Sequence, residues 1–163
     1  MRDATDRRFF SLPESSLAMR ALSRVDYFDV FSAEVGREAT LEAVARRVLG
    51  GRPPRLMRLR DALVRPFGLK TSPSGARPVP RFVAGERIGL FTLFERSADE
   101  LLLGEDDRHL DFRVCLRVAG GKATLATLVH FRNLWGRAYF FLIRPFHALI
   151  VRRMLRRATA SRA

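Results

Sequence analysis

The sequence predicts a single α+β domain, in which a run of antiparallel strands is followed by a long helix that covers one face of the sheet. Three observations predict it. Apolar residues alternate with mostly polar ones over residues 110–119, which is the period of a half-buried strand. Two glycines separate this segment from another strand-like run, and residues 136–158 carry an apolar stripe at helical spacing.

The first half of the chain predicts one strand and two short helices. Aromatic and β-branched residues over 25–31 indicate the first strand. Thr40 is a typical N-cap for a helix over 41–49, and the glycine pair that follows would end it. Apolar residues at helical spacing predict a second helix over 56–67, followed by a loop rich in Pro, Ser and Gly over 70–80.

The second half predicts two pairs of strands. Apolar runs over 88–94 and 101–103 are joined by a polar turn and indicate the first pair. The second pair consists of the segments 110–119 and 122–132. The glycine pair 120–121 between them suits a two-residue hairpin turn, because such a turn needs the positive φ that glycine allows.

The C-terminal helix over 136–158 should pack on the sheet through one broad apolar stripe. The stripe consists of Tyr139, Leu142, Ile143, Phe146, Leu149, Ile150 and Met154. Pro145 lies inside this pattern, and we expect it to kink the helix or split it in two. His147 lies at the edge of the stripe, where we expect a core or rim histidine.

Composition places the chain among globular proteins of a reducing compartment. Its 163 residues make one domain over 1–163, with an ordered core over about 12–158. The single Cys115 excludes an intramolecular disulfide and a thiolate metal cluster. No secretory signal is visible, and the most membrane-like stretch, 138–151, is shorter than the roughly twenty residues that a span needs. We therefore expect a cytoplasmic protein.

The formal net charge of +13 raises the question of a polyanionic partner. Nearly all basic residues are Arg, which fits a GC-rich coding bias, and most are scattered along the chain. The basic tail over 152–163 is denser. Its candidate polyanion-binding residues are Arg152, Arg153, Arg156 and Arg157. We expect neither nucleic acid nor an anionic membrane to be a partner, so deleting the residues after Leu155 should leave any such binding unchanged.

The segment DDRHLDFR packs six ionisable side chains into eight positions at the start of a predicted strand. A two-residue turn at the glycine pair would make Asp111 face His130 and His109 face Arg132. With Arg113, these side chains would form one polar patch on one face of the sheet, while the apolar residues between them pack on the other face.

A carboxylate beside an imidazole is a common arrangement for proton transfer. The candidate catalytic residues are therefore Asp111, His130, His109 and Arg113. A charged row on an antiparallel strand is also simply the solvated face of a sheet, and its charge would then mainly hold the register of the hairpin. The histidine spacing does not favour a metal site, and no phosphate-binding, nucleophile-elbow or HExxH motif is present. We expect no metal and no cofactor.

Three stretches, LMRLRDALVRPFGLK, ELLLGEDDRHLDFRV and GRAYFFLIRPFHALIV, resemble the signature of a bacterial family catalogued as domain of unknown function 2867. The resemblance extends from about Leu12 to Ala158. That family is similar to the helix-grip superfamily of START, SRPBCC and pollen-allergen proteins. The resemblance implies a curved sheet that wraps a long C-terminal helix around an apolar cavity, and the fold hosts binders, carriers and enzymes alike.

The function we expect is the binding of a small apolar or amphipathic molecule between the sheet and the C-terminal helix, in a pocket of about 300 Å³ or more. The expected ligand-binding residues are Tyr139, Leu142, Phe146, Ile150, Phe112 and Phe131. One alternative is an enzyme that acts on such a ligand by acid–base chemistry through Asp111 and His130. A second alternative is association with nucleic acid or an anionic membrane through the Arg-rich tail.

Overall fold

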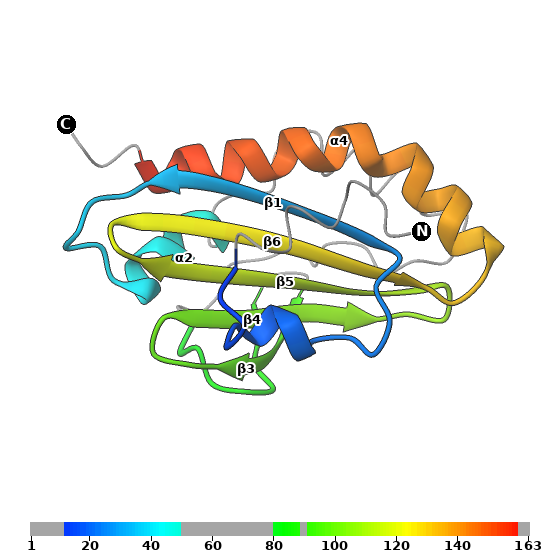
Figure 1. The fold of residues 1–163 in the computed structure, drawn as a ribbon, viewed down its shortest axis with the longest axis horizontal. Helices are drawn as coiled ribbons and strands as arrows, with labels where there is room; N and C mark the ends of the chain where they lie inside the picture. Colours follow the sequence, from blue (N-terminus) through cyan, green and yellow to red (C-terminus); the bar gives the residue numbers. More distant parts are fainter. Residues whose placement is uncertain (1–11, 50–79, 89–90, 160–163) are drawn as a thin grey trace.

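The protein forms a curved, open, six-stranded antiparallel sheet with a long C-terminal helix (Figure 1). A computed structural model describes residues 12–49, 80–88 and 91–159. The strands are β1 (Tyr27–Glu34), β2 (Arg87–Ile88), β3 (Phe91–Arg96), β4 (Glu100–Asp106), β5 (Leu110–Ala119) and β6 (Lys122–Phe131). The helical elements are the 3-10 turn η1 (Leu17–Arg20), α2 (Leu41–Leu49) and α4 (Leu134–Thr159). The strand order is β1-β6-β5-β4-β3-β2.

The predicted α+β class is confirmed, and so are the first strand, the helix over 41–49 and the long C-terminal helix. Thr40 caps the helix as expected, because its Oγ1 accepts a hydrogen bond from the Ala43 amide. The second helix and the Pro-rich loop that we predicted over 56–80 lie almost wholly outside the described residues.

The β5–β6 hairpin has the predicted register. Gly120 and Gly121 both adopt positive φ, at 60° and 77°, and the turn makes Ala119 face Lys122. Counting outward from this turn, Asp111 faces His130, as the sequence indicated. The sheet continues through β1, which pairs with β6 along its full length.

One face of the sheet forms the main core with α2 and α4. Side chains that are hardly exposed, among them Leu93, Leu101, Leu103, Leu116 and Leu125, lie in this layer. Most of them belong to the middle strands β4, β5 and β6. Burial of this layer removes apolar surface from water and is the dominant favourable term in folding.

The opposite face carries a second core beneath the N-terminal segment, which the sequence did not predict. Leu17 and Ala18 of η1 cover Cys115, Ala126 and Leu128, all of which are nearly inaccessible to solvent. The Leu17 amide donates a hydrogen bond to the buried carboxylate of Glu100, and this contact fastens η1 to β4. The face that contains Asp111 is therefore only partly solvated.

Helix α4 is continuous through Pro145 and curved (Figure 1). Proline has no amide hydrogen, so the carbonyl of Phe141, four residues before Pro145, lacks its usual helical donor. Both residues lie on the exposed side, where water can satisfy that carbonyl. The helix begins close to the β4–β5 turn, because Gly136 lets its backbone approach the His109 carbonyl. A Cβ at Gly136 would lie 2.0 Å from that oxygen. No helix in the described part of the chain is long and apolar enough to cross a membrane.

Candidate functional site

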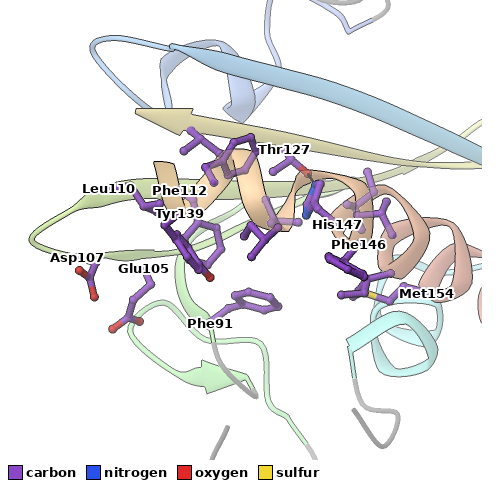
Figure 2. Close-up of a pocket in the computed structure, with 17 residues that line it drawn as sticks. Phe91, Glu105, Asp107, Leu110, Phe112, Thr127, Tyr139, Phe146, His147 and Met154 are labelled. Carbon is purple, nitrogen blue, oxygen red and sulfur yellow. Dashed lines mark hydrogen bonds between the residues drawn. The ribbon is translucent and has the colours of Figure 1, made fainter. Parts of the chain in front are cut away.

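A cavity of about 150 Å³ lies between α4 and the sheet (Figure 2). Its wall is mainly aromatic and aliphatic and comes from β3, β4, the β4–β5 turn, β5, β6 and α4. The lining residues are Phe91, Glu105, Asp107, Leu110, Phe112, Val114, Leu125, Thr127, Val129, Tyr139, Phe140, Ile143, Phe146, His147, Ile150, Val151 and Met154. The cavity lies where we predicted it, and it is about half the size that we predicted.

Four of the six residues that we expected to bind a ligand line this cavity: Phe112, Tyr139, Phe146 and Ile150. Leu142 does not line it, since its side chain lies on the outer side of α4 and is 51% exposed. Phe131 does not line it either, because its ring packs against Phe140, with the ring centroids 5.5 Å apart.

The inner stripe of α4 is rotated relative to the one that we expected. The inward positions are Gly136, Phe140, Ile143, His147, Ile150, Val151, Met154, Leu155 and Ala158. We expected Leu142 and Leu149 on this side because they are apolar and lie at helical spacing from other apolar residues. Both are exposed, so α4 carries large apolar side chains on its inner and outer sides.

A buried polar cluster that the sequence did not predict lies where α4 meets β1 and β6. His147 Nε2 lies 3.2 Å from Thr127 Oγ1 and 3.3 Å from Asp29 Oδ2. The Tyr27 hydroxyl donates a 2.7 Å hydrogen bond to the same Asp29 oxygen. His147 and Thr127 line the cavity (Figure 2). Asp29, which contacts His147, is buried, with a 2% exposed fraction.

The electrostatics of this cluster keep Asp29 ionised. Burial by itself works to raise the pKa of Asp29, but the hydrogen bond and the charge of His147, together with the Tyr27 hydroxyl, outweigh it and hold that pKa below its ordinary value. Burial and the neighbouring Asp29 carboxylate raise the pKa of Tyr27 to about 12. Tyr27 therefore stays a hydrogen-bond donor at neutral pH.

The signal for this cluster was present in the sequence but was weak. Residues two apart share a face of a strand, so Asp29 shares its face with Tyr27 and with Phe31, which packs against the main core. A lone acid within this aromatic strand indicates a buried carboxylate that needs a partner. Its partner His147 comes from the far end of the chain, and no local pattern relates the two residues. The expectation of a core or rim histidine at His147 is met, since it bonds Thr127 and Asp29.

The candidate catalytic residues of the DDRHLDFR segment lie elsewhere. Asp111 and His130 face each other, but they are on the sheet face opposite to Phe112 and therefore opposite to the cavity. The single Nε hydrogen of Arg132 is shared between both carboxylate oxygens of Asp111, with Nε 2.9 Å from Oδ1 and 2.8 Å from Oδ2. His130 Nδ1 instead contacts Asp26 Oδ2 at 2.8 Å. The Asp111–His130 pair therefore cannot act on a molecule in this cavity.

Asp26 fastens the start of β1 to the end of β6. Its carboxylate accepts hydrogen bonds from the Phe131 amide at 2.9 Å and from Arg24 at 3.0 Å, in addition to the His130 contact. Burial works to raise the pKa of Asp26, but these hydrogen bonds from Phe131, His130 and Arg24 outweigh it and lower that pKa. This arrangement is structural, since it satisfies strand-end groups on the face away from the cavity.

The two remaining candidates also make structural contacts. The guanidinium of Arg113 lies 3.9 Å from the centre of the Phe94 ring and pairs with Asp106 at 2.7 Å, while its side chain is almost wholly buried. His109 Nδ1 lies within hydrogen-bonding distance of the Asn133 side chain at the start of α4. Both residues therefore hold the β4–β5 turn region in place.

The arginines of the basic tail extend the C-terminal half of α4. Arg152, Arg153 and Arg156 are exposed, and Arg157 is partly buried. The guanidinium of Arg152 lies over the ring of Phe31, 5.4 Å from its centre. The final residues of the tail, 160–163, lie outside the described residues.

A sequence family matches most of the chain. The sequence model of DUF2867, a family of proteins of unknown function, matches residues 21–154, from just before β1 to near the end of α4. The chain belongs to this family. The match confirms the DUF2867 resemblance seen in the sequence, and it includes both Asp29 and His147. No curated protein and no solved structure matches the chain.

Proposed function

We propose that this DUF2867 domain binds a small, mainly apolar molecule with one polar group in the cavity between α4 and the sheet. The observation that supports it is a mainly aromatic and aliphatic wall that His147 and Thr127 interrupt at one place, apart from Glu105 and Asp107. A concave apolar site with few convergent polar groups is typical of small-molecule binding.

The cavity volume sets the size of the ligand. A cavity of about 150 Å³ lined by aliphatic and aromatic side chains is large enough for a single benzene-sized ring. The best match is therefore one aromatic ring or a short branched chain, and a long acyl chain would not fit. Phe91 and Tyr139 both lie across this volume from His147, where they can contact an apolar ligand (Figure 2).

The polar group of the ligand would lie against His147 and Thr127. Both side chains can donate or accept hydrogen bonds. Because the Asp29 carboxylate orients His147 from behind, a ligand hydroxyl or carbonyl meets a preorganised partner there. A hydrocarbon of the same shape would leave this pair without a ligand contact and would bind more weakly.

The arrangement of a curved sheet against a long C-terminal helix supports the finer assignment to the helix-grip superfamily. We include that assignment in the proposal, together with a bacterial origin and a cytoplasmic location. The cavity lies between these two layers, where that fold places its ligands, and the buried thiol of Cys115 fits a reducing compartment.

Native mass spectrometry of the freshly purified protein tests the proposal directly, because a retained ligand adds its mass to that of the chain. Ligand-observed NMR with phenol, toluene, indole and short branched alcohols extends the test to a protein purified without ligand. We expect at least one aromatic alcohol to bind more tightly than its hydrocarbon counterpart. No added mass together with no binding in this panel would refute the proposal.

Two substitutions on α4 provide a matched comparison. Ile150→Phe places a larger side chain in the cavity and should lower the affinity for the best probe by about tenfold or more. Leu142→Phe makes a similar change on the exposed side of the same helix and should leave that affinity unchanged. Equal effects of the two substitutions would place the bound molecule outside the cavity.

The second candidate function is acid–base catalysis on the same ligand, with Asp29 and His147 in place of Asp111 and His130. The observation that favours it is the buried carboxylate and imidazole contact at the cavity wall, 3.3 Å between Oδ2 and Nε2. His147→Gln keeps a hydrogen-bonding side chain but cannot transfer a proton as imidazole does. If the wild-type protein converts a retained ligand to another species, this variant should bind the ligand and convert it at least about a hundredfold more slowly.

A further inference from the structure

Helix α4 exposes a stripe of large apolar side chains on the side that faces away from the cavity. Leu134, Trp135 and Phe141 are 79%, 67% and 77% exposed, and Leu142 and Leu149 are 51% and 42% exposed. Residues seven apart in a helix lie two turns apart on the same side, so these five side chains share one surface. We call them the outer stripe.

The outer stripe continues into a basic surface along the same side of the helix. Arg152, Arg153 and Arg156 follow Leu149 by three, four and seven residues, and all three are exposed. Helix α4 contains six arginines and neither Asp nor Glu. An apolar surface about 24 Å long, at 1.5 Å per residue, therefore ends in a cluster of positive charge with no acidic residue on the helix to neutralise it.

We propose that the outer stripe and these arginines dock this domain on the surface of an anionic lipid bilayer, with α4 lying in the plane of the membrane. Trp and Phe side chains favour the boundary between head groups and acyl chains, and apolar side chains of an interfacial helix enter that boundary. Arginines near it attract and hydrogen-bond lipid phosphates. The helix is too polar to cross the membrane, so it would lie on it.

The charge of α4 favours an anionic bilayer over a second copy of the chain as the partner. In a symmetric pair formed through α4, the arginines of each copy would meet either the arginines or the apolar half of the other copy, and neither arrangement supplies an anion. Charge and apolar surface together also separate a membrane from nucleic acid. Phosphate backbones would attract the arginines but offer no apolar medium to Phe141 and Leu142. The anionic bilayer is the partner that complements both halves of the surface.

This proposal revises our expectation that the tail has no anionic partner, because that expectation weighed the arginines without the outer stripe. It does not depend on the ligand proposed for the cavity. The cavity lies on the inner side of α4, so a failure of ligand binding and a failure of membrane docking would be separate results.

Trp135 is the only tryptophan of the chain and belongs to the outer stripe, so its fluorescence reports the docking of the full-length protein. With vesicles that mix phosphatidylcholine and phosphatidylglycerol, we expect co-sedimentation, a blue shift of the emission, and quenching by brominated acyl chains. Vesicles of phosphatidylcholine alone should bind at least about tenfold more weakly, and added salt should weaken the anionic case. Co-sedimentation without any change in Trp135 emission would overturn the proposal.

Three variants separate the outer stripe from charge alone. Phe141→Ser with Leu142→Ser changes only exposed side chains and should weaken vesicle binding about tenfold or more. Arg153→Gln with Arg156→Gln should weaken it several-fold at low salt. Arg20→Gln with Arg24→Gln removes the same charge from the opposite side of the sheet, and its vesicle binding should stay within about twofold of that of the wild type.

Three further outcomes would also overturn the proposal. The first is an equal loss of vesicle binding in the Arg20/Arg24 control and in the Arg153/Arg156 variant, which would mean that net charge alone drives binding. The second is a dimer in sedimentation velocity without lipid that dissociates in the Phe141/Leu142 variant. That result would assign the outer stripe to self-association. Retained binding of a DNA duplex by the Phe141/Leu142 variant, with no vesicle binding by the wild type, would assign the arginines to nucleic acid.

Discussion

Replacing Asp29 with Asn tests whether the buried cluster beside the cavity stabilises the fold as an ionised group. The carboxylate accepts one short hydrogen bond from Tyr27 and one longer contact from His147, on the same oxygen. An asparagine oxygen can keep one of these contacts, but it carries no charge. A hydrogen bond to a buried charged group contributes about 1.5–3 kcal/mol, so Asp29→Asn should lower the free energy of unfolding by about 2–3 kcal/mol at neutral pH.

The assay is urea unfolding followed by circular dichroism, with a thermal melt as a second measure. For a chain of this length, the loss corresponds to a fall in Tm of about 4–12 °C. Asp99→Asn is a matched control, because Asp99 is 42% exposed and its ion pair with Arg117 is at the surface. It should change the free energy of unfolding by less than about 0.5 kcal/mol.

The pH dependence gives the sharper test of the charge. The folded-state pKa of Asp29 lies below its ordinary value, so its contribution is fully present above the unfolded pKa and is lost as the pH falls through the folded pKa. Asparagine does not titrate. The stability difference between wild type and Asp29→Asn should therefore be constant from neutral pH down to about 5 and shrink below about 4. A difference that stayed constant to lower pH, or no difference at neutral pH, would refute the reasoning.

Three other parts of the structure make separate predictions. Burial and the neighbouring Glu100 raise the pKa of the Cys115 thiol to about 12, so it should resist a thiol reagent in the native protein and react only after urea unfolding; rapid native labelling would contradict this. Gly136→Ala should lower the free energy of unfolding by about 1–3 kcal/mol, because its Cβ would overlap the His109 carbonyl, whereas the same change in an open helix position would gain about 1 kcal/mol. In double-mutant cycles, Asp111→Asn should be coupled to Arg132→Gln and additive with His130→Gln; the reverse pattern would mean that the side chains pair as the strand register alone suggests.

The sheet was predictable because its information is local. The glycine pair fixes the β5–β6 turn, and a two-residue turn determines every facing pair by counting outward, including Asp111 with His130. The register does not determine which side chain each of these residues then contacts. Arg132 lies just beyond β6 and reaches Asp111, while Asp26 comes from a distant segment to take His130. Long side chains and segments distant in sequence decide which of several nearby partners a residue contacts. The strand register does not specify these contacts.

The faces of α4 and of the sheet were harder to predict, because burial is a tertiary property. Apolar side chains such as Phe141 and Phe140 are adjacent in sequence, and one is 77% exposed while the other is 6% exposed. Helical spacing indicates that a stripe exists, but it does not say which of two apolar stripes packs on the sheet. Similarly, nothing near Cys115 in the sequence indicates that η1 covers it. The contact between Asp29 and His147 depends on which stripe of α4 and which face of the sheet pack together.

The energetics of that cluster bear on its function. A buried carboxylate hydrogen-bonded to a polar partner is a weak stabiliser, since removing charge from water offsets most of the attraction, and apolar residues of similar volume often stabilise a core more. The rest of the inner side of α4 follows that pattern with Phe140, Ile143 and Ile150. Asp29 and His147 depart from it at the cavity wall, and Asp29 Oδ1 is buried without a hydrogen bond to any residue in the described part of the chain. Stability alone would favour apolar side chains at both positions. A polar ligand group in the cavity that binds an oriented imidazole would give a physical reason for polar side chains at these two positions.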